Sequence, residues 1–190
     1  MKILLTLLVL LFSPSVFAED ISDFQIEGIS IGDSLLDYFS EDEIKKNTGF
    51  NVYDYKKDKT FVLAAFEKTS QNEYYDILQV HYKRNDKKRI LYGISGMNYY
   101  KNNIDNCYIK KVEIIKQISP ILEKAKKTNE SGKHDADASG KSTVDSTFFD
   151  FVSGDYVSVA CYDWSNEVPY LDKLVVSVTS KELGTWLISN

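Results

Sequence analysis

Two histidines, His81 and His134, are the only imidazole groups in the chain and the first candidates for acid and base chemistry. Neither belongs to a His-x-x-His or Glu-x-x-His pair, which a zinc site would favour, and no glycine-flanked serine accompanies either histidine. A distant carboxylate can still complete an acid and base pair in space. The residues therefore leave open a hydrolase that uses His81, but they favour His81 as a half-exposed strand residue.

An acidic stretch at residues 135–140 has the opening pattern of a calcium loop. Asp135, Asp137 and Ser139 supply oxygen atoms at the first, third and fifth positions, and glycine follows at the sixth. The twelfth position lacks the bidentate glutamate, and Asp145 comes one residue early. These four residues are weak metal candidates, and a solvated acidic loop is the favoured interpretation. We expect no cofactor.

Two cysteines, Cys107 and Cys161, allow a single disulfide. Their wide separation argues against a redox motif, which usually has the spacing Cys-x-x-Cys. Helical spacing places Cys107 on the apolar face of a predicted helix, and strand alternation places Cys161 on the same side as Val157 and Val159. The pattern predicts a disulfide that joins this helix to the sheet.

The same alternation directs Tyr156, Tyr162 and Trp164 to the opposite face of the strand, with Lys173 alongside on a neighbouring strand. Tyrosine and tryptophan are enriched in binding surfaces because they offer a large contact area at a low entropic cost. We therefore expect these three aromatic residues to form a recognition surface. The alternative is that the first half of the chain or the terminal helix covers this face.

Several helices and strands must position these residues. Residues 35–44 have rough helical spacing after a cap at Asp33 or Ser34, and Ser40 with Glu43 predicts a capping box that restarts a short helix to about residue 47. A longer helix is expected from Asn103 to the break at Pro120. A terminal helix is expected at 180–188, with Thr179 and Glu182 spaced as a capping box. Strands are expected at 60–67, 74–84, 89–96, 147–152, 155–164 and 171–179, and residues 126–145 are expected to form an exposed, mobile loop.

This element order predicts an α+β fold in which helices pack on an antiparallel sheet. Residues 76–82 resemble 155–162 slightly, and residues 90–95 resemble 174–179. The mature chain, residues 19–190, is expected to form a single α+β domain, within which these resemblances would mark two repeats. Two repeats, at about 24–100 and 101–190, and one unrepeated domain both stay open.

The segment 31–37, Ile-Gly-Asp-Ser-Leu-Leu-Asp, followed by strands, resembles small exported bacterial α+β proteins of the BamE type and of the β-lactamase inhibitor protein type. Those families commonly show a glycine, a small polar cap and an apolar-acidic helix packed on an antiparallel sheet. The resemblance implies a non-enzymatic role in binding or assembly. The lipidated cysteine of the family is absent here, and no functional residue is carried over.

The first eighteen residues have the pattern of a secretory signal peptide. Lys2 precedes an apolar run at 3–12, and the small residues Val16 and Ala18 are typical of a cleavage site before Glu19. The apolar run is shorter than the roughly 20 residues that a membrane span needs. The net charge of −5 argues against a nucleic-acid partner. We expect a periplasmic or secreted protein with no integral membrane segment in the mature chain.

The sequence as a whole favours an exported, non-catalytic binding or adaptor protein of the cell envelope. It would contact a protein partner, such as another envelope protein, through Tyr156, Tyr162 and Trp164. The alternatives that stay open are a periplasmic hydrolase and a small-ligand or calcium-binding protein.

Overall fold

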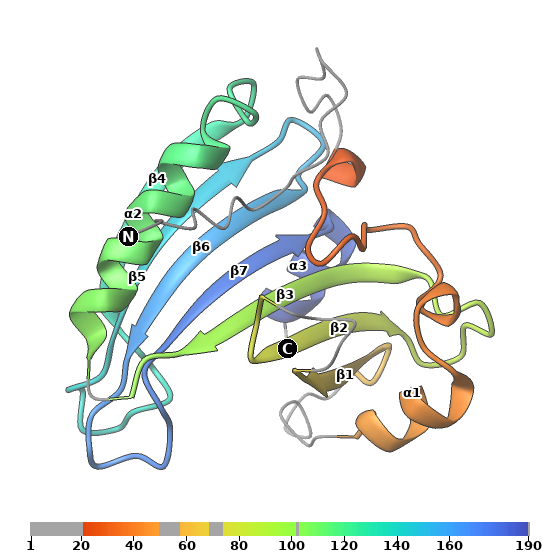
Figure 1. Cartoon of the computed structure of the whole chain (residues 1–190), viewed down its shortest axis with the longest axis horizontal. Coiled ribbons are helices and arrows are strands. Elements are labelled where there is room, and N and C mark those ends of the chain that lie inside the picture. Colours follow the sequence, from red (N-terminus) through yellow and green to blue (C-terminus); the bar gives the residue numbers. More distant parts are fainter. Residues whose placement is uncertain (1–20, 50–57, 69–73, 102, 190) are drawn as a thin grey trace, which may run out of the picture.

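A computed structural model describes residues 21–49, 58–68, 74–101 and 103–189 of the chain (Figure 1). The predicted signal peptide, residues 1–18, lies outside the described residues. No helix within the described ranges is long and apolar enough to cross a membrane.

One antiparallel sheet of seven strands organises the molecule, in the order β1-β2-β3-β7-β6-β5-β4. The strands are β1 (Phe61–Glu67), β2 (Ile77–Lys83), β3 (Leu91–Tyr99), β4 (Lys126–Lys133), β5 (Thr143–Asp150), β6 (Tyr156–Asp163) and β7 (Lys173–Thr179). The predicted α+β class and the antiparallel sheet are confirmed. The segments proposed as repeats lie in equivalent places, because β3 pairs with β7 while β2 and β6 flank this pair. The duplication itself stays a prediction.

The helices largely follow their predicted caps. The short helices are η1 (Ile21–Asp23), η2 (Leu35–Asp37) and α1 (Glu41–Asn47), and the longer ones are α2 (Ile104–Ile118) and α3 (Lys181–Ser189). The Ser40 and Glu43 capping box is present, and Asn103 caps α2. Instead of the helix predicted from Leu35, the chain forms one 3-10 turn, because Ser40 adopts the extended backbone that its capping role requires. The capping box predicted for Thr179 is also wrong, since the Ser180 hydroxyl accepts the Leu183 N–H at 3.3 Å.

The prediction of a mobile loop at 126–145 is wrong for most of that range. Residues Lys126–Lys133 form the edge strand β4, which pairs with β5 along its whole length. Seven of its eight residues are exposed, so the strand buries almost no side chain and shows no hydrophobic alternation. Main-chain hydrogen bonds hold it in the sheet, and lysines at both ends are typical of a protected edge.

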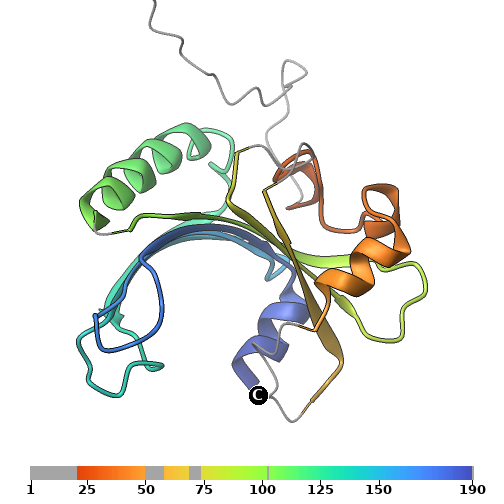
Figure 2. The same ribbon diagram turned by 60° about the horizontal axis from the view of Figure 1, so that its bottom comes forward.

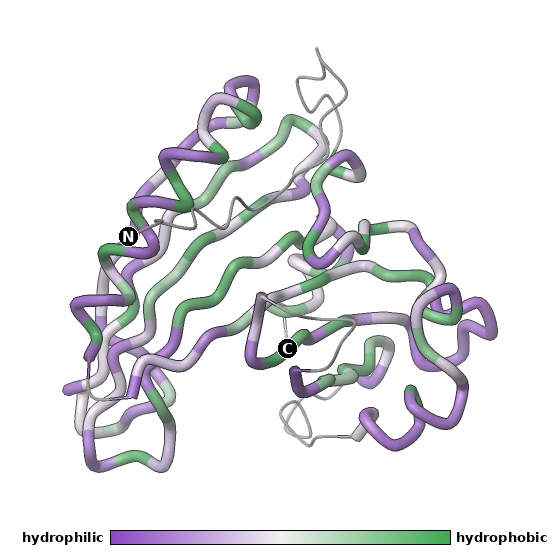
Figure 3. Tube along the Cα trace, viewed as in Figure 1, coloured by the Kyte–Doolittle hydropathy of each residue, from purple (hydrophilic) through white to green (hydrophobic). Residues whose placement is uncertain are grey.

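The main core lies on the outer, convex face of the sheet, beneath α2 and the N-terminal segment (Figure 2). Leu78 and Val80 of β2 and Val157 and Val159 of β6 are fully buried there. Figure 3 shows hydrophobic segments recurring along the central strands, while α1 and the β2–β3 turn are hydrophilic. The predicted disulfide is confirmed: Cys107 of α2 is bonded to Cys161 of β6, with their Cα atoms 6.0 Å apart.

Candidate functional site

The sheet is arched, and its inner face carries α3 on one side and the β4–β5 and β6–β7 loops on the other (Figure 2). Residues that stand directly opposite one another in an antiparallel ladder share a face. The pairing of β3, β7 and β6 therefore arranges the inner face as successive rows of side chains that cross the strands. Each row has a different chemistry.

The row nearest the loops is Tyr99 on β3, Lys173 on β7 and Tyr162 on β6. The Lys173 ammonium lies 5.3 Å from the centre of the Tyr162 ring, within the range of a cation–π interaction. The predicted position of Lys173 beside Tyr162 is thus confirmed. Tyr99 flanks Lys173 on the other side, which the sequence did not indicate.

The two loops add further rings to this row. His134 lies 4.4 Å from Trp164 and 5.6 Å from Tyr162 between ring centres, and Tyr170 lies 4.6 Å from Trp164. We refer to His134, Tyr162, Trp164 and Tyr170 as the aromatic cluster. Burial, with the nearby positive charge of Lys173, lowers the pKa of His134. The imidazole is therefore neutral at pH 7, and its Nδ1 accepts the Ala136 N–H at 3.1 Å.

A buried carboxylate holds the two loops together. Asp137 is only 5% exposed, and its oxygens accept hydrogen bonds from the Ser142 hydroxyl at 2.7 Å, the Ser139 N–H at 2.9 Å and the Ser165 hydroxyl at 3.0 Å. The Ser142 hydroxyl in turn accepts the Ser165 N–H at 2.9 Å. These hydrogen bonds, led by that of Ser142, hold the pKa of Asp137 well below its usual range. The charged carboxylate therefore fixes the His134 loop against the loop that follows Trp164.

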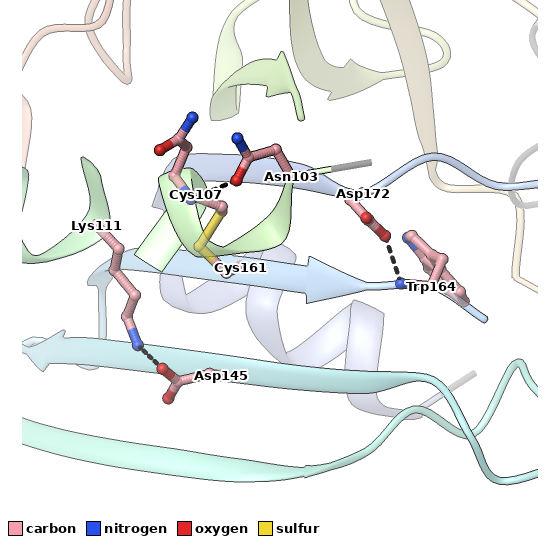
Figure 4. The surroundings of a disulfide bond; sticks show 8 residues. Asn103, Cys107, Lys111, Asp145, Cys161, Trp164 and Asp172 are labelled. Carbon is pink, nitrogen blue, oxygen red and sulfur yellow. Dashed lines mark hydrogen bonds and ion pairs between the residues drawn. A yellow bond between two sulfur atoms is a disulfide. The ribbon is translucent and has the colours of Figure 1, made fainter. Parts of the chain in front are cut away.

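A second carboxylate orders the start of the β6–β7 loop. Asp172 accepts the Trp164 backbone N–H at 2.8 Å (Figure 4). This bond joins the end of β6 to the start of β7, so the backbone that carries the Trp164 ring is held on both sides. The aromatic cluster is thus pre-organised, which lowers the entropic cost of binding.

The four calcium candidates do not converge on one site. Asp135 and Ser139 are exposed, and Asp137 is engaged by the hydrogen bonds of its own loop. Asp145 points to the other face of the sheet, where it forms an ion pair of 3.0 Å with Lys111 of α2 (Figure 4). The described ranges contain no group of three or more acidic, histidine or cysteine side chains that could hold a metal ion.

A hollow lies beside the aromatic cluster on the same inner face, with a volume of about 350 Å³. His134 and Tyr162 line it at the loop end, Ser146 and Phe148 at its floor, and Glu130 at the edge strand. Next to it, the central strands carry small hydroxyl side chains on the inner face. The hydroxyls of Ser95 on β3 and Ser177 on β7 lie 2.8 Å apart. Small side chains leave room above the strands, and hydroxyl groups offer hydrogen bonds to an occupant.

Helix α3 covers the far end of the inner face. A methyl group at Gly93 would overlap Leu183, and one at Gly184 would lie 2.9 Å from the Tyr156 ring. Tyr156 therefore lies against α3, six residues and about 20 Å along the strand from Tyr162. The structure brings Tyr162 and Trp164 together, whereas Tyr156 packs against α3, with its ring centre 5.9 Å from that of Phe148 at the floor of the hollow.

The same helix buries the side chain of His81. The expectation of a half-exposed imidazole is wrong, because His81 is only 5% exposed and lies beside Gly93, where α3 packs on the sheet. Burial lowers the pKa of His81 to about 4. In this arrangement, His81 presents no base to the surface. Strand alternation gives the face of a residue correctly but does not reveal what packs on that face.

Sequence reasoning missed His134 and Tyr170 as parts of the cluster. Both lie in loops, where no periodicity indicates which way a side chain points. A larger hollow of about 650 Å³ lies on the outer face between α2 and the edge of the sheet, lined by Lys111, Val112 and Thr147 among others. It holds the Lys111 and Asp145 ion pair but no cluster of rings.

No family model, curated protein or solved structure matches this chain.

Proposed function

We propose that this chain is an exported, non-catalytic binding protein that captures a protein partner on the inner face of its sheet. The observation that carries the proposal is the aromatic cluster beside the hollow, on two loops that the Asp137 network holds together. Aromatic side chains with restricted backbones are the usual anchors of protein interfaces.

Exposed apolar side chains around the cluster support a macromolecular partner. Tyr170 is 52% exposed, Leu171 is 44% exposed and Tyr99 is 39% exposed. All three lie at the same end of the sheet, where β3 ends and β7 begins. Large apolar side chains that gather at one end of a molecule are typical of interaction sites, whereas single ones scattered on a surface are ordinary.

Two further features support the compartment and the lack of catalysis in this proposal. The buried disulfide between Cys107 and Cys161 is of a kind that persists outside the reducing cytosol. It agrees with the signal-peptide pattern at residues 1–18. The burial of His81 beneath α3 removes the one residue named for a hydrolase from the surface.

Site-directed photo-crosslinking in the native cell envelope tests the proposal. A benzophenone amino acid replaces Tyr170 in the mature protein, and the control carries it at Val152, which is fully exposed in the turn between β5 and β6. We expect a defined protein adduct from position 170 and none from position 152. An excess of unlabelled parent protein should abolish the adduct, and an excess of folded Trp164→Ala protein should not.

Equal adducts from both positions, or an adduct that Trp164→Ala competes away as well as the parent does, would contradict the proposal. Circular dichroism of the Trp164→Ala protein establishes that it is folded before the competition is interpreted.

A further inference from the structure

Lys173 is a half-buried cation without a carboxylate partner among residues 21–49, 58–68, 74–101 and 103–189. It stands between Tyr99 and Tyr162 in the row nearest the loops. No carboxylate of the described residues forms an ion pair with its ammonium within 4.0 Å. Burial alone lowers the pKa of Lys173, with no opposing contribution from a nearby acidic group.

Two other lysines of the described residues that are at least half-buried show the contrast. Lys83 is paired with Glu182 at 2.7 Å. Lys111, 5% exposed, is paired with Asp145 at 3.0 Å. The chain has 28 acidic residues against 23 basic ones, so carboxylates are plentiful. Glu130, which lines the hollow, belongs to β4, three strands from β7 and thus at least about 14 Å away. Within the part of the chain that the structure describes, the fold therefore pairs Lys83 and Lys111 with carboxylates and leaves Lys173 without one.

The surroundings of Lys173 would strengthen an ion pair formed there. The Tyr162 ring lies 5.3 Å from the ammonium, and Tyr99 stands beside Lys173 in the ladder. Partial burial of the ammonium lowers the local dielectric constant and raises the Coulomb attraction to an incoming anion. His134, the other titratable group of the cluster, is neutral at pH 7 and does not compete for the anion. The Lys173 ammonium can therefore offer its donors to an approaching carboxylate.

We infer that Lys173 binds an aspartate or glutamate side chain of the protein partner, while the aromatic cluster packs on the apolar residues beside that side chain. This inference rests on the proposed function and names the chemistry of the partner. Charge complementarity is its basis, because a partly desolvated ammonium gains most from a carboxylate that arrives with its own apolar surroundings.

A displayed library of random twelve-residue peptides, selected on the mature protein, supplies the probe. We expect the selected peptides to combine aromatic or aliphatic residues with at least one Asp or Glu. Changing that acid to its amide should weaken binding to the parent about tenfold, as expected for a partly buried charge pair. Against Lys173→Met, the acid and amide peptides should bind equally.

The Lys173→Met protein should unfold at the same temperature as the parent or a higher one, because it loses an uncompensated charge. A purely structural role for Lys173 would instead lower stability and the binding of all peptides together. Lys88→Met, in the exposed β2–β3 turn, makes the same change in net charge and should leave the preference for acidic peptides intact.

Peptides that bind without any enrichment of acidic residues, or whose acid is equally important for Lys173→Met, would overturn the inference and leave the proposed function standing. A library that yields no binder to the parent would overturn both.

Discussion

Removing the disulfide provides a quantitative test of how the sheet and α2 are held together. The bond joins Cys107 to Cys161 across 54 positions of the chain. In the chain-entropy model, a cross-link that closes a loop of this length destabilises the unfolded state by about 4 kcal/mol at 25 °C. Both cysteines are fully buried, so replacing them with alanine removes two sulfur atoms from a packed site and adds about 1 kcal/mol. We therefore expect the double alanine variant to lose about 5 kcal/mol of unfolding free energy.

Equilibrium denaturation in guanidinium chloride at pH 7 measures this loss. The slope of the unfolding free energy with denaturant should increase as well, because an unfolded chain without the cross-link is less compact and exposes more surface. Val159→Ala is a matched control: Val159 is fully buried on the same face of β6, and the substitution leaves the disulfide in place. It should lower the free energy through packing alone, without a change in slope.

The reasoning would be refuted by a double variant that loses less than about 1 kcal/mol, or by one whose slope equals that of the parent. Either result would mean that α2 and β6 stay together in the unfolded ensemble, or that packing alone holds the helix on the sheet.

Three further predictions test the packing of the sheet. The folded-state pKa of His81 is about 4, below the unfolded value of about 6.5. The contribution of the neutral imidazole to stability is therefore full above about pH 6.5 and is lost as the pH falls toward 4. The parent should therefore lose about 2 kcal/mol more than His81→Gln between pH 7 and pH 5, measured by denaturation at each pH. Gly93→Ala should cost about 1–3 kcal/mol by displacing α3, whereas Gly132→Ala, with open space around it, should change the melting temperature little. Asp145→Ala should cost about 1–3 kcal/mol by leaving Lys111 buried without its carboxylate, and adding Lys111→Met should restore most of it; no recovery in urea denaturation would show that the ion pair is not the cause.

The sequence alone predicts those features that depend on residues close together in the chain. Strand alternation gives the correct faces for Cys161, Tyr162 and Lys173, because side chains of a strand point to opposite sides in turn. The capping box at Ser40 is also local, since its two partners are three residues apart. Because the chain has only two cysteines, one disulfide is possible, and this long-range contact can also be predicted from the sequence.

The edge strand and the burial of His81 depend on the tertiary structure. β4 is polar on both sides, and it is a strand because its main chain pairs with β5. His81 is buried because α3, a hundred positions further along the chain, packs on its side of the sheet. No pattern within either segment contains this information.

The candidate site shows the same division. Sequence alternation predicts a shared face for Tyr156 and Tyr162, yet Tyr156 packs against α3. The Asp137 network instead joins the two loops that bring His134 and Tyr170 to Trp164. Local sequence thus determines which way each strand residue points. Which segments cover a face, and which rings meet above it, depends on contacts between residues far apart in the chain, and only the complete fold decides these.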